Sequence, residues 1–143
     1  MFAELALLLV AATSSAEPSD DSRACSALLV GDWNETEASL AGAGGTWTTR
    51  FRADGTFTEK GELQFPNQAA RKYDISGTWQ LLKGTLTYVV NQSADPSLIP
   101  IGMVSIDHVK EINAASMTYQ DRAGRLLKMT RAMPRQIERP CAF

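Results

Sequence analysis

The sequence predicts an all-β protein, an eight-stranded antiparallel barrel with up-and-down strand order. From Leu28 onward apolar and polar residues alternate with a period close to two, as in strands with one buried face. Short turn signals join these stretches, which favours antiparallel neighbours over crossover helices. Gly-x-Trp occurs three times, at residues 31–33, 45–47 and 77–79. Its Gly allows another backbone to approach closely, and its Trp fills a large volume in a core. Closing such a sheet into a barrel removes its exposed edges.

The N-terminal residues 1–16 have the pattern of a secretory signal peptide. An apolar run over residues 5–12 precedes a small-residue cleavage site at 14–16, although Glu4 stands where a basic residue is usual. An N-terminal core helix is the alternative. We expect residues 17–24 to be a flexible leader and residues 25–143 to be one barrel domain, periplasmic or secreted. The apolar run is too short to span a bilayer, and no later run is long enough, so no integral membrane span is expected.

The eight strands follow in order, each bounded by turn residues. We expect them at residues 28–37, 45–52, 56–63, 72–82, 85–91, 103–112, 116–120 and 125–130. Hairpin turns are expected at 53–55, 83–84, 113–114 and 121–124, where residues tolerant of turn geometry occur. Longer loops fall at 38–44, 65–70 and 92–100. The first is rich in Gly and Ala and the third contains Pro96 and Pro100, so both are expected to be mobile or open-ended.

The alternation also assigns the inward face of each strand. The inward residues are Trp47, Thr49 and Phe51; Phe57, Glu59, Gly61 and Leu63; Tyr73, Ile75, Gly77, Trp79 and Leu81; Leu86, Tyr88 and Val90; Met117 and Tyr119. Gly61 and Gly77 are expected to leave volume for a ligand, because a sealed core would favour larger residues there. Glu59 breaks an otherwise apolar face, where an unpaired charge is costly. We expect either a wet barrel mouth at Glu59 or a partner for it, such as Arg131 or a ligand.

The two cysteines, Cys25 and Cys141, lie just outside the first and last expected strands. Export and an even cysteine count favour their pairing as a disulfide. In a closed barrel with an even number of strands, the start of the first strand and the end of the last lie at the same rim. The bridge is therefore expected to lace the seam between those strands. No His cluster accompanies the cysteines, so no metal site is expected.

Two anchor residues carry a resemblance to the lipocalins. Leu28-Leu29-Val30-Gly31-Asp32-Trp33 is similar to the motif that opens the first lipocalin strand, in which the Trp plugs the closed end of the barrel. The resemblance implies that Arg131, at the end of the last strand, lies across Trp33, and that both are structural. The Thr-Asp-Tyr motif and the C-terminal helix of many lipocalins are missing. The chain looks more like short exported bacterial lipocalin-like domains, in which hairpins similar to Asp54-Gly55-Thr56-Phe57 recur.

An interior site for a small apolar or amphipathic molecule is the function that this architecture favours. An eight-stranded barrel is just wide enough to be filled or to hold one small ligand. The expected ligand-binding residues are Trp47, Glu59, Tyr73, Trp79, Tyr88 and Tyr119. The alternative is a protein-interaction module of the cell envelope, such as a barrel-type protease inhibitor, with a protein partner bound through loops 38–44 and 92–100.

Other function classes find little support in the residues. The formal net charge of −2, with mixed signs, gives no electrostatic case for binding nucleic acid. His108 is the sole histidine, and no motif ties a nucleophile or a carboxylate to it, so we expect a surface or rim residue. Asp32, Glu35, Glu37 and Glu59 include possible carboxylate pairs on separate strands. We expect neither enzymatic activity nor a cofactor.

Overall fold

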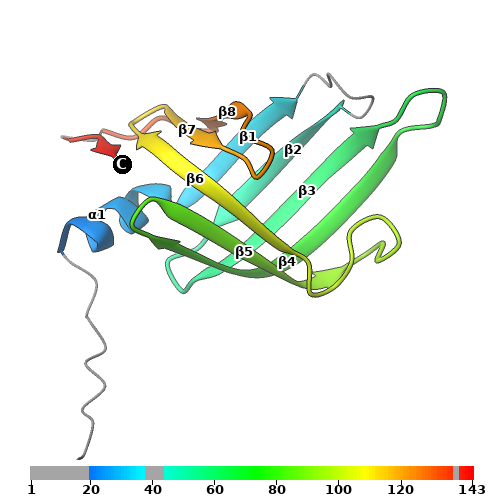
Figure 1. Cartoon of the computed structure of the whole chain (residues 1–143), viewed down its shortest axis with the longest axis horizontal. Helices are drawn as coiled ribbons and strands as arrows, with labels where there is room; N and C mark the ends of the chain where they lie inside the picture. The colour runs from blue at the N-terminus through cyan, green and yellow to red at the C-terminus, as the bar shows by residue number, and fades with distance from the viewer. Residues whose placement is uncertain (1–19, 38–43, 137–138) are drawn as a thin grey trace, which may run out of the picture.

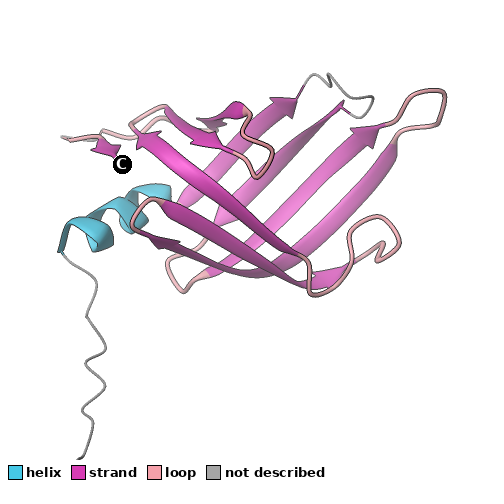
Figure 2. Cartoon of the chain, in the orientation of Figure 1, coloured by secondary structure: helices cyan, strands magenta, loops and turns pink. Residues whose placement is uncertain are grey.

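The computed structural model describes residues 20–37, 44–136 and 139–143, which form a barrel with one short helix (Figure 1). Its elements are α1 (Asp20–Leu29), β1 (Gly31–Glu37), β2 (Gly44–Phe51), β3 (Thr56–Gln64), β4 (Arg71–Leu82), β5 (Thr85–Ser93), β6 (Val104–Ile112), β7 (Ser116–Gln120), β8 (Leu126–Arg131) and β9 (Cys141–Ala142). β1 to β8 pair antiparallel, each with the next, and β8 pairs with β1 (Figure 2). The predicted eight-stranded barrel is confirmed. No helix in the described ranges is long and apolar enough to cross a membrane.

The start of the barrel differs from the expectation. The described part of the expected leader, residues 20–24, belongs to α1, and the first strand begins at Gly31 rather than Leu28. Cys25 and Leu29 of the helix are buried against the barrel end, which explains why the helix forms there. Gly31 links helix to strand with a φ of 138°, a conformation that side-chain-bearing residues rarely adopt. The expected signal peptide, residues 1–16, lies outside the described residues.

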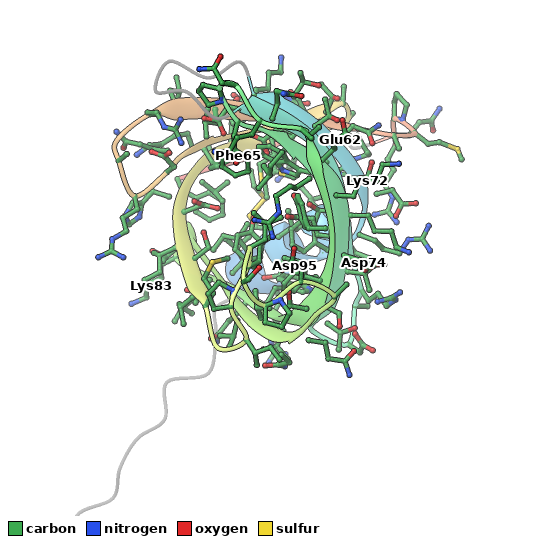
Figure 3. All side chains as sticks on the ribbon, turned by 90° about the vertical axis from the view of Figure 1, so that its right-hand side faces the viewer. Glu62, Phe65, Lys72, Asp74, Lys83 and Asp95 are labelled. Atoms are coloured by element: carbon green, nitrogen blue, oxygen red, sulfur yellow. A yellow bond between two sulfur atoms is a disulfide. The ribbon has the colours of Figure 1, made fainter. Side chains whose placement is uncertain are left out.

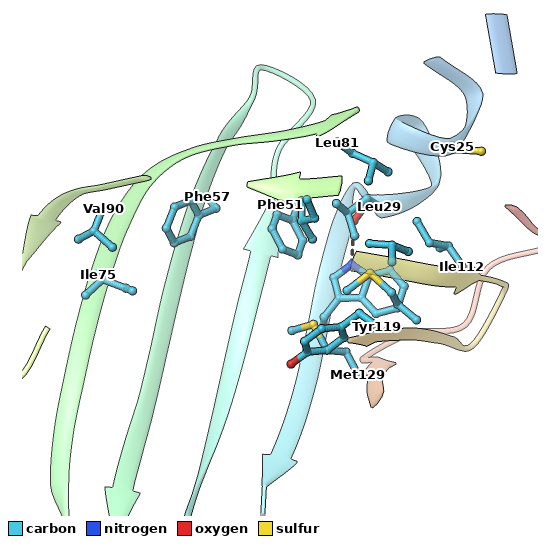
Figure 4. Close-up of a cluster of buried hydrophobic side chains, with 14 of the residues drawn as sticks. Cys25, Leu29, Phe51, Phe57, Ile75, Leu81, Val90, Ile112, Tyr119 and Met129 are labelled. Atoms are coloured by element: carbon cyan, nitrogen blue, oxygen red, sulfur yellow. Dashed lines mark hydrogen bonds between the residues drawn. The ribbon is translucent and has the colours of Figure 1, made fainter. Parts of the chain in front are cut away.

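A cluster of buried side chains closes the end of the barrel that α1 covers. Leu29, Leu81 and Ile112 gather there (Figure 4). The indole N–H of Trp33, a fully buried residue, donates to the Leu29 carbonyl at 2.7 Å. The Arg131 guanidinium carbon lies 4.1 Å from the centroid of the Trp33 ring, the placement that the lipocalin resemblance implied. Arg131 also donates to the carbonyl of Val30 at 3.1 Å and to that of Leu28. This end of the barrel is therefore plugged.

The predicted disulfide between Cys25 and Cys141 is confirmed, but its place in the fold is not the one expected. Cys141 lies in β9, which pairs with Glu111 and Ile112 of β6 rather than with the β1–β8 seam. The bond therefore ties α1 to a ninth strand on β6. This addition is possible because β5 pairs with β6 only from Val104 to His108, which leaves the later residues of β6 open on that side.

The β7–β8 hairpin is shorter than its neighbours, so its ladders cover only the plugged half of the wall. β7 pairs with β6 from His108 to Ile112, and β8 pairs with β1 at Trp33 and Asn34. Glu35 and Asp107 each lie one residue beyond these ladders, on β1 and β6. The long strands continue to the opposite end, the mouth, where Phe65 and Asp95 lie near the rim (Figure 3). Asp95 pairs there with Arg71, which also donates to the Ser97 hydroxyl at 3.0 Å.

Candidate ligand-binding cavity

A cavity of about 350 Å³ lies inside the barrel. Five of the six expected ligand-binding residues line it: Trp47, Glu59, Tyr73, Tyr88 and Tyr119. Apolar side chains complete much of the wall, including Ile75, Val90, Ile99 and Met129. Ile99 comes from the loop before β6 and is buried, so this part of the loop folds inward rather than standing open.

Trp79 is the expected ligand-binding residue that does not line this cavity. Its indole N–H donates to the Arg52 carbonyl at 3.0 Å, and its ring meets Phe51 edge-on with centroids 5.5 Å apart. It borders a separate groove beside α1, together with Arg23 and Leu81. These contacts show that Trp79 packs near the plugged end and does not face the cavity.

The glycines expected to open the interior do not do so. A Cβ at Gly61 would lie 2.6 Å from the Trp47 Cβ and 2.7 Å from Tyr73 Cε1, so neighbouring side chains already occupy that space. A Cβ at Gly77 would lie 1.8 Å from the Val89 carbonyl oxygen, at a bulge in the β4–β5 pairing. Both glycines permit close approach of neighbouring groups.

Glu59 faces the interior and is held by two hydroxyl groups. Thr49 Oγ1 donates to its Oε2 at 2.6 Å, and the Tyr73 hydroxyl donates to its Oε1 at 2.8 Å. Burial raises the pKa of Glu59, while these two hydrogen bonds oppose the rise. The suggested pairing with Arg131 is wrong, because Arg131 is committed to Trp33 and the nearby carbonyl groups at the plugged end.

Glu35 is a second interior carboxyl group, on β1. The Tyr119 hydroxyl lies 2.6 Å from its Oε1 and 2.8 Å from its Oε2. Only 4% of Glu35 is exposed. Burial raises its pKa to about 7, although the hydrogen bond from Tyr119 acts in the opposite direction.

Asp107 on β6 is the third interior carboxyl group, and sequence reasoning missed it. Burial raises its pKa to about 6, and a hydrogen bond with the Tyr88 side chain opposes the rise. The signal was present in the alternation, because Asp107 shares a strand face with buried Val109. His108 is exposed, on the opposite face of β6.

The three tyrosines that meet these carboxyl groups remain protonated donors. Burial raises the pKa of Tyr73, Tyr88 and Tyr119, and the adjacent carboxyl groups raise it further. Tyr88 is fixed by packing, since its ring stacks on Phe51 at 5.7 Å and meets Phe57 edge-on at 5.6 Å. Three carboxyl–tyrosine pairs thus present fixed polar groups in a largely apolar wall.

In the described part of the chain, one cationic side chain borders the cavity, and it is already paired. Arg125, after the β7–β8 turn, forms an ion pair with Glu37 of β1. Its Nε also donates to Asp121 at 2.7 Å. Within the described ranges, no group of three or more His, Cys, Asp or Glu side chains is placed to hold a metal ion.

The chain matches no protein-family model, and no curated protein matches its sequence. The closed eight-stranded barrel is consistent with a lipocalin-like fold.

Proposed function

We propose that this chain is an exported lipocalin-like barrel that binds one small amphipathic molecule in its interior. The cavity of about 350 Å³, with aromatic and aliphatic walls and a few fixed polar groups, carries the proposal. Small-molecule sites commonly have about 300 to 1,000 Å³ and this mixture of surfaces. The plug at Trp33 leaves the mouth and the adjoining wall as the routes to the cavity.

The disulfide supports export, because such bonds persist mainly in oxidising compartments. It also ties α1, part of the plug, to β9, so it supports the closed end rather than the cavity. An exported carrier gains a more stable plugged end from such a tie.

Ligand uptake can be tested by blocking the cavity. Leu63, half-buried near the mouth, lines it, and Leu63→Trp would fill part of it. Leu82→Trp is the matched control, because Leu82 is 45% exposed and lies outside the cavity lining. A fluorescent apolar probe should bind the wild type and Leu82→Trp but not Leu63→Trp. Equal binding by all three proteins would overturn the proposal.

A protein-interaction role is the second candidate, and one surface feature favours it. Ile101, Val104 and Ile106 are exposed to 60%, 50% and 43%, next to the loop over residues 92–100. The other expected contact loop, 38–44, lies mostly outside the described residues. Inhibition assays against representative secreted proteases, with Ile101→Asp as the disrupting variant, test this role.

A further inference from the structure

We propose that the ligand is an organic cation, a protonated amine with an apolar body, whose ammonium group lies among Glu35, Glu59 and Asp107. This inference rests on the proposed function and names the chemical class that the cavity selects. It follows from the charges of the lining, the aromatic faces beside them and the shape of the space.

The charges that line the cavity are strongly one-sided. Among the residues that the structure describes, five carboxyl groups border it, from Glu35, Glu37, Glu59, Asp107 and Asp121, against the single cation of Arg125. Arg125 is engaged by Glu37 and Asp121. Among the described lining residues, the three inner carboxyl groups therefore have hydroxyl partners but no cation. A buried carboxylate without a counter-charge is costly, and an ammonium group would supply that charge.

The hydroxyl partners hold these carboxyl groups in position, and the carboxyl oxygens can still accept further hydrogen bonds. Each oxygen of Glu59 accepts one hydrogen bond, and Glu35 accepts from the Tyr119 hydroxyl and from the Trp47 side chain. A carboxylate oxygen has two lone pairs, so each group can accept further from the N–H donors of an ammonium. An anionic ligand would meet like charges here, and a wholly apolar one would leave the carboxyl groups uncompensated.

Aromatic rings stand beside the carboxyl groups and suit a cation as well. Trp47 is the cross-strand neighbour of both Glu35 and Gly61. Because Gly61 has no side chain, Trp47 and Tyr73 approach each other over it. Cations are attracted to the faces of such rings, and the attraction grows when water is excluded. Tyrosine and tryptophan beside carboxylates are a suitable environment for an alkylammonium group.

The space fits an organic cation better than a bare metal ion. The carboxyl groups come from β1, β3 and β6, and no described group of three converges as metal ligands do. The cavity of about 350 Å³ leaves room for an apolar body against Ile75, Val90 and Met129. Burial raises the pKa of Glu35 to about 7, so assays belong at about pH 8, where that group is mostly ionised.

The test compares three ligands of matched shape by calorimetry: 2-phenylethylamine, 2-phenylethanol and 3-phenylpropionate. The amine should bind at least about tenfold more tightly than the alcohol, and the acid more weakly than either. Glu35→Gln and Glu59→Gln keep an oxygen acceptor but remove the charge, so each should weaken amine binding much more than alcohol binding. Glu62→Gln is the control on the same strand as Glu59, since Glu62 is exposed and points outward.

The outcomes separate the two proposals. If the alcohol or the acid binds as tightly as the amine, or if the two glutamine variants bind the amine like wild type, the cation inference is overturned while the carrier proposal stands. If the apolar probe binds in the cavity but the amine does not, the inference is likewise overturned. If neither the probe nor any member of the series binds, or if Leu63→Trp binds them unchanged, the carrier proposal fails and the inference fails with it.

Discussion

The Tyr119 hydroxyl joins β7 to β1 by donating to the Glu35 carboxyl group, at 2.6 and 2.8 Å from its two oxygens. These strands are not neighbours, because β8 lies between them. The β1–β8 ladder consists of pairs at Trp33 and Asn34, so Glu35 is the next residue toward the mouth. This side-chain hydrogen bond thus connects β7 to β1 at the point where the β1–β8 backbone ladder ends. The same Glu35 carboxyl group faces the cavity.

Tyr119→Phe should lower the free energy of unfolding by about 1 to 3 kcal/mol, because it removes a hydroxyl donor from a buried carboxyl group. Urea unfolding at about pH 8 measures the loss, which should shrink at lower pH as Glu35 becomes protonated. In a Glu35→Gln background the same substitution should cost less. Additive effects of the two changes would contradict the coupling.

The stability of the folded state should fall as pH rises, because Glu35 favours its protonated form in the fold. Its ordinary pKa of 4.5 rises to about 7 on burial. The folded state therefore binds more protons than the unfolded state between these values, and stability is lost as pH rises through them. The loss attributable to Glu35 is on the order of 3 kcal/mol at most. Asp107, with a pKa raised to about 6, acts in the same direction.

Glu35→Gln isolates this effect, because glutamine resembles the protonated carboxyl group. The variant should match wild type at about pH 4.5 and be more stable at about pH 8. Urea midpoints across this range measure both proteins, with Glu62→Gln as the exposed control. A wild-type profile that stays level, or that Glu35→Gln does not flatten, would show that Glu35 titrates normally.

Amine affinity should have the opposite pH profile. An alkylamine stays protonated over this range, so its binding depends on ionised carboxyl groups. Glu35 faces Tyr119 and Trp47, with Glu37 and Glu59 nearby, and Asp107 faces Tyr88, with Asp121 and Glu59 nearby. Affinity should rise through about pH 6 to 7 by up to about tenfold per unit for each proton released. Titrations in buffers of different ionisation enthalpy would count the protons, and a level profile would contradict the coupling.

Trp33→Ala should destabilise the protein by about 3 to 5 kcal/mol, because it empties the plugged end of the barrel. Arg131→Ala should cost less by itself, and the two effects should not add, since the guanidinium carbon lies 4.1 Å from the ring centroid. Urea unfolding of both single variants and the double variant measures the coupling. Binding of the apolar probe, under conditions where each variant is folded, should change little.

Cys25→Ser with Cys141→Ser should destabilise the protein by about 4 to 5 kcal/mol on the chain-entropy estimate, because the bridge spans 116 positions. Thermal unfolding with and without reductant gives the comparison. Reductant should affect the wild type but not the double variant. Free thiols at both positions in protein from an oxidising compartment would contradict the bond.

Local patterns in the sequence were enough to predict the barrel wall. Period-two alternation and turn residues located the eight strands, because the alternation reflects which side chains face the interior. Helix α1 was missed because only part of one of its faces is buried. Its first residues are mostly polar, which is also typical of the flexible leader that was expected there. The pairing of β9 with β6 was missed because it depends on where β5 begins to pair with β6.

The candidate site was predictable in part for the same reason. The alternation placed Glu59 and five aromatic residues of the cavity lining on inward faces. It did not identify their partners, because contacts such as Glu35 with Tyr119 depend on the relative register of distant strands. The roles given to Gly61 and Gly77 were wrong because the space beside a glycine depends on its neighbours across the sheet.

The arrangement of α1 and β9 also suits attachment of the protein to a sensor surface. Phe143 donates its backbone N–H to Lys110 beside the plugged end, and the disulfide holds α1 to the same region. A linker added after Phe143 would therefore leave the mouth facing solution. Immobilised in this orientation, the barrel presents its cavity to dissolved molecules, and a dye near the mouth could report occupancy without obstructing the tether.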